Sequence, residues 1–522
     1  MNILNKVQAA CSHGVQRLNQ LMDAGTETLE KTSKGLLKFS TIVLTSTVVA
    51  ISISSCDKNL DQNNFDQSTS AGSLATLSCA DTVSIPVDAN GIITATTLTK
   101  DKLWKLNGVS YVKDGQVLSI EAGTTIITGR TKTYNDPTYG IQNLAGVLVV
   151  ARGGQLIANG TATQPIVFTS PSAGGCGSGC SSAGAFGGVV LLGKATTNRN
   201  VAVRIEGIPQ PAGTDITYGG PGNTIANDNS GSLKYVRIEF PGYKLAADNE
   251  INGLTLGGVG SGTTLSHIQV SYSADDAFEF FGGTVNADHL VAIGTDDDDF
   301  DFDFGYSGTI QYAIGLKDPG TTNSTSGGNS DSNGIESDND GTGTSALPKT
   351  KPVLRNFTLL GYGSNSIGSG KLKNGNRWRR ASSLDLQNSI IAGFPTGATF
   401  ESITNVGSSF INNVVHAYTT VSSASPTFPS TYGIDPFDQS NYASANSFLK
   451  LANDGAFFTC SLASSYDPLY LRPNTLSPAY DGADGEFTED GLSYRGAIAP
   501  AATATTIWTA GWTNFNPGFC CK

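Results

Sequence analysis

The chain has 522 residues, of which 62 are glycine and only 15 % are charged. Its formal net charge is −12, the opposite of what nucleic-acid binding requires, so we exclude nucleic acid as a partner. The sparse charge, the abundant glycine and the many β-branched and aromatic residues favour a β-rich extracellular protein over a helical one.

The N-terminal segment, residues 1–55, has the pattern of an export signal. A lysine-rich stretch precedes an uncharged apolar run from Phe39 to Ile53, which is the order of a secretory signal. The run is shorter than the roughly 18 residues that a membrane-spanning helix requires. Its ending, Ile53-Ser-Ser-Cys56, resembles the lipobox of bacterial lipoproteins. That resemblance implies that Cys56 is lipidated, becomes the mature N-terminus and anchors the protein to a membrane.

The remaining chain divides into three parts by composition. Residues 56–94 begin with a stretch rich in Asn, Gln, Ser and Asp, which is typical of a flexible tether. Residues 95–420 carry short strands and are predicted to form one solenoid. Residues 421–522 are less regular, and we expect them to cover the exposed strand edges of the last coil.

Six cysteines remain once Cys11 and Cys56 are set aside. An even number in an exported protein predicts disulfides. Cys176 and Cys180 lie in one Gly/Ser-rich loop, and we predict that they pair with each other. Zinc is a poor alternative because no histidine lies near them in sequence. The pairing of the other four stays open; they are Cys79, Cys460, Cys520 and Cys521.

Short alternating strands bounded by Gly, Asn and Pro follow from about Trp104 onward. Val117 to Ile126 reads as a strand, a glycine turn and a second strand, and Gly146 to Ala158 repeats that form. Long polar insertions on one face of a solenoid often mark its binding face. Such insertions interrupt the strands at about 131–145, 171–185, 207–230, 318–333 and 368–376.

Between Leu265 and Gly315 the chain repeats with a period near 22 residues. His267 followed by an apolar residue recurs as His289, and Asp276-Ala-Phe-Glu-Phe recurs as Asp298-Asp-Phe-Asp-Phe. This period fits one solenoid coil of three short strands. Coils stack at a strand spacing of roughly 4.8 Å, so residues one period apart are predicted to lie above one another.

Alternation within this repeat predicts a column of carboxylates. If Phe278 and Phe300 point inward, Glu279 and Asp301 point outward. Oxygen-only ligands favour Ca²⁺ among the metals, so the column is a candidate calcium site. A solvated negative face and a set of catalytic carboxylates are the two alternatives. This acidic ladder comprises Asp276, Glu279, Asp298, Asp301, Asp303, Glu336 and Asp338.

A basic cluster follows the ladder and is unusual in so acidic a chain. Its members could neutralise the nearby carboxylates, or they could hold an anionic sugar, with Trp378 stacking on the pyranose ring. The cluster comprises Lys371, Lys373, Arg377, Trp378, Arg379 and Arg380. His267 and His289 are expected to form a surface stack, because we identify no carboxylate or cysteine placed in sequence to complete a metal site.

Several of the strand motifs resemble those of a known family. Glu121-Ala-Gly-Thr-Thr-Ile, Gln164-Pro-Ile-Val-Phe-Thr-Ser and Gly187-Gly-Val-Val-Leu-Leu-Gly are similar to the N-terminal coils of right-handed parallel β-helix lipoproteins of Gram-negative bacteria. Those proteins have the pectin-lyase-like architecture, and the likeness covers roughly residues 95–515. The resemblance implies an all-β, right-handed parallel β-helix. It does not imply one activity, because this fold carries lyases, hydrolases, adhesins and structural proteins.

The expected function is that of a lipid-anchored protein of the outer membrane or cell surface. We expect it to bind extracellular polysaccharide or a neighbouring surface through its insertions, without catalysis. One alternative is a polysaccharide lyase or hydrolase that uses Ca²⁺ on the ladder and a base from the basic cluster. The other is a purely structural protein of the cell envelope.

Overall fold

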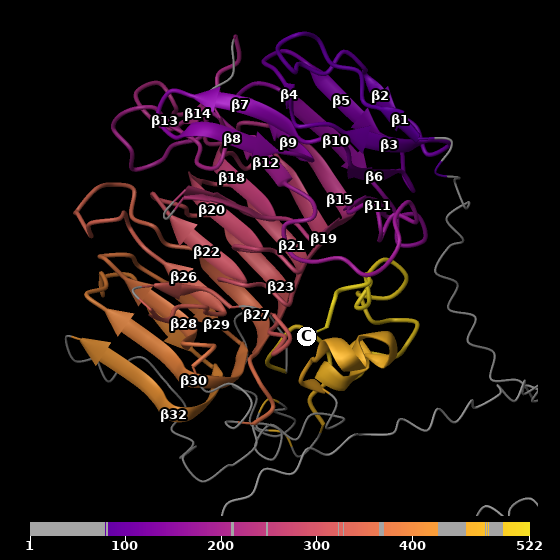
Figure 1. Ribbon diagram of the computed structural model, residues 1–522. Coiled ribbons are helices and arrows are strands. Elements are labelled where there is room, and N and C mark those ends of the chain that lie inside the picture. The colour runs from indigo at the N-terminus through magenta and orange to yellow at the C-terminus, as the bar shows by residue number, and fades with distance from the viewer. Residues whose placement is uncertain are drawn as a thin grey trace, which may run out of the picture. The chain divides into compact units, whose positions relative to one another are not determined.

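The structure is a computed structural model (Figure 1). It describes residue 79 and residues 82–209, 213–246, 249–321, 323–326, 328–364, 370–425, 456–474, 477, 479 and 494–521. The export segment, Cys56 and most of the expected tether lie outside these residues. Within them, no helix combines the length and the apolar character that crossing a bilayer would require.

Parallel strands stack in register along three faces of a β-helix (Figure 1). Sheet 1 contains β4 (Val109–Val112), β9 (Val147–Val150), β12 (Gly188–Leu192), β18 (Leu254–Val259), β20 (Phe278–Gly283), β22 (Phe300–Asp303), β26 (Ile335–Ser337), β28 (Asn374–Arg379) and the C-terminal parts of β30 (Ile390–Glu401) and β32 (Val414–Ser425).

Sheets 2 and 3 are joined by long bent strands that contribute to both. Sheet 2 contains β1 (Thr82–Ser84), β3 (Leu103–Leu106), β6 (Thr125–Thr128), β11 (Ile166–Thr169), the C-terminal parts of β15 (Gly231–Glu239), β19 (Thr264–Ser271), β21 (Asn286–Ile293), β23 (Thr309–Leu316) and β27 (Val353–Leu360), and the N-terminal parts of β30 and β32. Sheet 3 contains β2 (Thr97–Leu98), β5 (Val117–Ile120), β10 (Gln155–Asn159), the N-terminal parts of β15, β19, β21, β23 and β27, β29 (Asp385–Gln387) and β31 (Ser409–Ile411). The parallel pairing begins at Thr82, earlier than the expected boundary at residue 95.

Antiparallel hairpins occupy several of the insertions. They are β7 (Lys132–Asp136) with β8 (Gly140–Leu144), β13 (Val203–Arg204) with β14 (Thr217–Tyr218), β16 (Tyr243–Ala246) with β17 (Asn249–Ile251), and β24 (Thr325–Ser326) with β25 (Asn329–Ser330). Each lies in a connection that enters or leaves sheet 1. Two 3₁₀ helices follow much later, η4 (Cys460–Ser465) and η5 (Pro468–Leu471).

The bent strands turn from sheet 3 to sheet 2 at a single residue. His267 and His289 have φ values of 57° and 56°, the left-handed region that few residues other than glycine adopt. One such residue interrupts the alternation and redirects the strand, so the pairing skips it in the register. The same corner recurs at Tyr235, Tyr312, Asn356, Asn388 and Asn412.

The phenylalanines of the repeat point into the core, as the alternation predicts. The rings of Phe278 and Phe300 stack with their centroids 5.3 Å apart, and those of Phe280 and Phe302 are separated by the same distance. All four are fully buried. The predicted inward face of the ladder strands is therefore correct.

Trp378 also points into this core, so its predicted contact with a sugar is wrong. Its side chain is fully buried, and the indole Nε1 donates to Asn376 Oδ1 at 2.7 Å. In the register Trp378 pairs with Ser337, which in turn pairs with Phe302. Trp378 therefore continues the inward column, while Arg377 and Arg379 on either side of it point outward.

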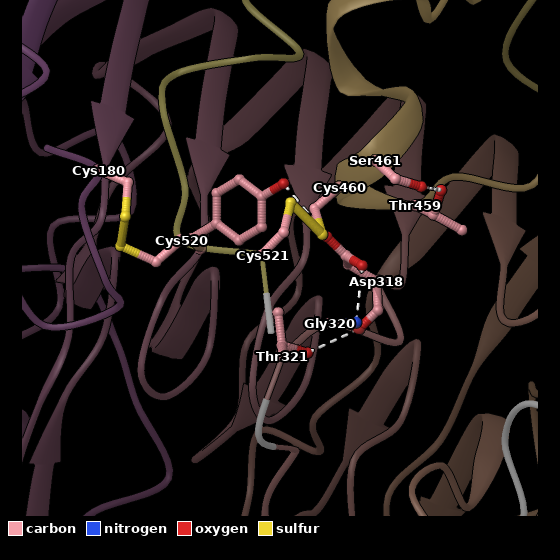
Figure 2. Close-up of a disulfide and its surroundings, with 10 residues drawn as sticks. Cys180, Asp318, Gly320, Thr321, Thr459, Cys460, Ser461, Cys520 and Cys521 are labelled. Carbon is pink, nitrogen blue, oxygen red and sulfur yellow. Dashed lines mark hydrogen bonds between the residues drawn. A yellow bond between two sulfur atoms is a disulfide. The ribbon is translucent and has the colours of Figure 1, made fainter. Parts of the chain in front are cut away.

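The predicted bond between Cys176 and Cys180 is also wrong. Cys176 pairs with Cys79, Cys180 pairs with Cys520, and Cys460 pairs with Cys521. Figure 2 shows the second and third bonds, which meet at the adjacent residues Cys520 and Cys521. The two cysteines of the Gly/Ser loop therefore connect to distant parts of the chain.

The C-terminal strap, residues 494–521, lies along the outer face of sheet 2, whereas the sequence predicts that this region covers the last coil. It runs from late coils toward early ones: Gly496 N–H donates to Asn388 O, and Cys520 N–H donates to Ser181 O, both at 2.8 Å. The outer face of sheet 2 is apolar and fully buried at Val291, Ile314 and Leu360. By covering this face, the strap removes these apolar side chains from contact with water.

Candidate functional site

The register of sheet 1 places Glu279, Asp301 and Glu336 in one column, as the 22-residue spacing predicts. Arg377 continues the same column one coil later. In the preceding coil, Glu279 pairs with the uncharged Thr255. A single line of outward side chains therefore passes from carboxylates to a guanidinium.

Asp276 and Asp298 form a second line, at the turn that precedes these strands. The Asp298 N–H donates to Asp276 Oδ1 at 2.8 Å, and the Asn333 N–H donates to Asp298 Oδ1 at 2.6 Å. Asn252 begins the series, because its Oδ1 accepts from the Asp276 N–H. One oxygen of each aspartate thus links consecutive coils, a structural role that the sequence did not reveal.

Five of the seven ladder residues are buried and Asp301 and Asp303 are half-buried, so the alternative of a solvated negative face is wrong. Asp276, Glu279, Asp298, Glu336 and Asp338 all have exposed fractions of 8 % or less. The carboxylates point away from the core, but the insertions lie over them. The ring of Tyr218 from β14 packs on the outer side of β20 against Phe281, with the two ring centroids 5.5 Å apart. In addition, Asn252 Nδ2 donates a hydrogen bond to Glu279 Oε2.

Burial disfavours the ionised form of the carboxyl groups in the acidic ladder. Burial, with added repulsion from neighbouring carboxylates, raises the pKa values of Asp276, Glu279 and Asp301 well above their ordinary range. One oxygen from each of these three residues lies within 4.8 Å of the others. Asp301 Oδ1 is buried without a hydrogen-bond partner. These oxygens fit a hard divalent cation such as Ca²⁺, which would offset the repulsion.

Two neighbouring carboxylates were missed at the level of sequence. Asp297 lies with Asp276 and Asp298 in a second group of oxygens within 4.8 Å. Asp299 forms a fully buried ion pair with Lys317, at 3.2 Å. Burial raises the pKa of Asp299 to about 6, although Lys317 opposes this shift. The run of four aspartates from Asp296 to Asp299 is the sequence feature that could have indicated both residues.

The basic cluster neutralises the C-terminal half of the ladder, so one of its two predicted roles is confirmed. Arg377 lies 3.1 Å from both Asp331 and Glu336 and 3.3 Å from Glu401. The remaining pairs are Arg379 with Glu336 and Asp338, both at 2.8 Å, Arg380 with Asp338 at 2.7 Å, and Lys373 with Asp331. Lys371 donates to the backbone oxygen of Pro319 at 2.5 Å.

An open groove lies over this end of sheet 1. We call it the arginine groove, and its lining residues are Thr342, Gly343, Arg377, Arg379, Arg380, Ala381, Glu401 and Ser402. The side chains of Arg380 and Glu401 are 42 % and 43 % exposed. Ligand-accessible charge is therefore concentrated at the C-terminal end of the ladder, whereas the oxygens of the N-terminal end are covered.

The two histidines stack as predicted, but they are half-buried and have a carboxylate beside them. Their ring centroids are 4.3 Å apart, and Trp508 and Trp512 of the C-terminal strap contact them edge-on. Asp288 Oδ1 lies 2.6 Å from His289 Nδ1. The expectation that no carboxylate completes this group is wrong, because Asp288 immediately precedes His289 in sequence.

The three-faced stack of parallel strands, with long insertions around one sheet, defines a parallel β-helix of pectate-lyase-like architecture. The chain belongs to the pectate-lyase-like beta helix domain family, whose model matches residues 91–443. Among solved structures it is similar to the crystal structure of PfbA, a surface adhesin of Streptococcus pneumoniae, with 10 % identity over 64 % of this chain and 68 % of that chain and a TM-score of 0.20. A search of curated proteins found no match.

Proposed function

We propose that this protein is an exported, lipid-anchored β-helix of the bacterial cell envelope, of the kind found in Gram-negative bacteria, and that it binds anionic polysaccharide in the arginine groove. The lipobox-like sequence at Cys56 supports the anchor. The three disulfides suit an oxidising compartment outside the cytoplasm. The protein is displayed at the outer membrane or cell surface, where extracellular polymers are available.

The observation that carries this proposal is the open groove that three arginines share. Guanidinium groups present several donors in one plane and bind carboxylate or sulfate groups with two parallel hydrogen bonds. Ion pairs with Glu336 and Asp338 hold the guanidinium groups of Arg379 and Arg380 in place. Such fixed donors lose little conformational freedom when a ligand binds, which favours affinity.

Binding is favoured over a lyase reaction by the charge state of the arginines. A base that removes a proton from a uronate must itself be unprotonated when it acts. Although burial opposes the shift, Glu336 and Asp338 raise the pKa of Arg379 above its ordinary range. Arg377 and Arg380 are held by the same carboxylates. Arg379 is therefore poorly suited to accept a proton, and all three guanidinium groups are placed to hold an anion.

Calcium has a supporting role in this proposal. The carboxylate oxygens of Asp276, Glu279 and Asp301 supply ligands for Ca²⁺ beneath the insertions. A bound ion would hold the covering insertions against sheet 1. It would thereby stabilise the coils that precede the arginine groove, without contacting the polysaccharide.

The test uses the soluble fragment 57–522 with acidic and neutral polysaccharides, in calcium or in chelator. We expect polygalacturonate, alginate or a sulfated glycan to retain the fragment, whereas dextran does not. Arg380→Gln should weaken retention at least tenfold, because it removes the most exposed guanidinium. Arg130→Gln is the matched control, an exposed arginine outside the groove.

Two results would contradict the proposal. Equal retention of wild-type and Arg380→Gln protein would remove the groove as the binding site. Shortening of an acidic polymer with formation of an unsaturated sugar end would make the protein a lyase. The anchor is tested separately, because Cys56→Ser should release the full-length protein from membranes and abolish incorporation of a labelled fatty acid.

A further inference from the structure

The histidine cluster, which we define as His267, Asp288 and His289, is a site that the proposed function does not use. His267 and His289 occupy the left-handed corners of consecutive coils, so their rings stack on one another. Tyr235 and Tyr312 extend the stack on either side. The aromatic column positions both imidazoles along one edge of the solenoid.

Asp288 brings a carboxylate to this pair. Its Oδ1 lies 2.6 Å from His289 Nδ1 and 3.8 Å from His267 Nδ1. All three ligand atoms lie within 4.8 Å of one another. The Asp288 side chain is 47 % exposed, and those of the histidines are 15 % and 23 % exposed. The carboxylate therefore faces water and gives an ion a path to the imidazoles.

We propose that His267, Asp288 and His289 bind a divalent transition metal ion of the Zn²⁺ type. Imidazole nitrogens with one carboxylate are ligands that zinc, nickel and copper prefer, whereas calcium prefers oxygen alone. A tetrahedral zinc ion with bonds of about 2.0–2.1 Å holds its ligand atoms roughly 3.3 Å apart. The two separations from Asp288 Oδ1 lie on either side of this value. Because the two rings are stacked, binding also requires them to rotate until a nitrogen lone pair of each points at the ion.

Among the residues that the structure describes, the other two groups of candidate metal ligands contain carboxylate oxygens alone. All six cysteines of the fragment 57–522 are in disulfides, so no thiolate competes for a soft metal. The acidic ladder offers only oxygens and can be saturated with excess calcium. The fourth ligand would come from water, which is usual where a protein supplies three.

The two tryptophans of the strap report on this site. The Trp508 ring centroid lies 5.0 Å from that of His289, and the Trp512 centroid lies 5.6 Å from that of His267. Ni²⁺ quenches indole fluorescence at such distances, and Zn²⁺ does not. The experiment titrates Ni²⁺ into fragment 57–522, prepared without a histidine tag and in excess Ca²⁺, and then adds Zn²⁺.

We expect saturable quenching at one ion per chain, with recovery of fluorescence as Zn²⁺ displaces Ni²⁺. The double variant His267→Phe with His289→Phe should abolish it while keeping the ring stack, because aromatic residues already occupy the same left-handed corner at Tyr235 and Tyr312. Asp288→Asn should weaken Ni²⁺ binding at least about tenfold and keep a hydrogen bond to His289. Asp114→Asn, an exposed carboxylate elsewhere, should change nothing.

Circular dichroism and the thermal midpoint establish that each variant is folded. Wild-type protein that is folded and shows no saturable quenching would overturn the proposal. Quenching that is unchanged in a folded double-phenylalanine variant would also overturn it. Neither result bears on the arginine groove, because polysaccharide retention is measured without Ni²⁺ or Zn²⁺.

Discussion

Arg377 follows Glu336 directly in the outward column of sheet 1, and its Nη1 lies 3.1 Å from Glu336 Oε1. The two residues are separated by 41 positions and an insertion, yet they occupy the same place on consecutive coils. This pair marks the point at which the column changes from negative to positive. The carboxylates before it form the candidate cation site, and Arg377 itself lines the arginine groove.

The Glu336–Arg377 pair should be strongly coupled. Both side chains are largely buried, so Arg377→Gln leaves carboxylates without a counter-charge and should cost about 3–5 kcal/mol of stability. Glu336→Gln in the same chain should restore part of this loss, because it removes one of the uncompensated charges. Urea denaturation of the two single variants and the double variant measures the coupling, which we expect at about 1–3 kcal/mol. Strictly additive effects would contradict a direct interaction.

Trp378 should contribute to stability and not to sugar recognition. Trp378→Phe should cost about 1–2 kcal/mol, because it leaves a partly empty site and a freed Asn376 amide oxygen. Retention of anionic polysaccharide by the folded variant should equal that of wild type. A variant with normal stability and lost retention would show instead that the indole reaches the ligand.

Removal of calcium should destabilise the ladder. If calcium is present at about 100 times its dissociation constant, chelation should lower the free energy of unfolding by about 2.7 kcal/mol. Glu279→Gln should respond less to calcium and should be more stable than wild type in chelator, because it removes one of several buried like charges. Differential scanning calorimetry in calcium and in chelator compares the two. A calcium-independent midpoint for the wild type would exclude the ion from the ladder.

The buried carboxyl of Asp318 should make the protein less stable as the pH rises. Burial raises the pKa of this carboxyl, although hydrogen bonds from Gly320 N–H, Cys460 N–H and the Tyr272 hydroxyl oppose the shift. The folded state therefore holds the proton more tightly than the unfolded state, and stability falls as pH rises from about 4 through the raised pKa.

Asp318→Asn should remove that dependence. The amide oxygen can still accept from Gly320, so the variant should be more stable than wild type at pH 7 and similar to it at pH 4. Denaturation midpoints across this range provide the measurement, with Asp114→Asn as an exposed control. A variant that is less stable at neutral pH would show that the charge itself is required.

Much of the β-helix could be predicted from local pattern. Alternation around Phe278 and Phe300 determines which side chains enter the core, and a constant period brings Glu279 and Asp301 into one column. Both signals are readable because each coil pairs only with its neighbours, so register follows from spacing alone. Where insertions break the period, as before Trp378, spacing no longer gives the register, and the indole was grouped with its basic neighbours in sequence although it lies in the core.

The tertiary structure decided what covers the solenoid. Cys180 and Cys520 are 340 positions apart, and no spacing rule links them, because the strap contacts coils that are distant from it in sequence. The insertions close over the acidic ladder for the same reason, since their contacts depend on loop shape. The amino-acid sequence by itself thus determined the repeating coil and its columns, where interactions are periodic. The folded chain decided burial and disulfide pairing, because those contacts join segments that share no repeat.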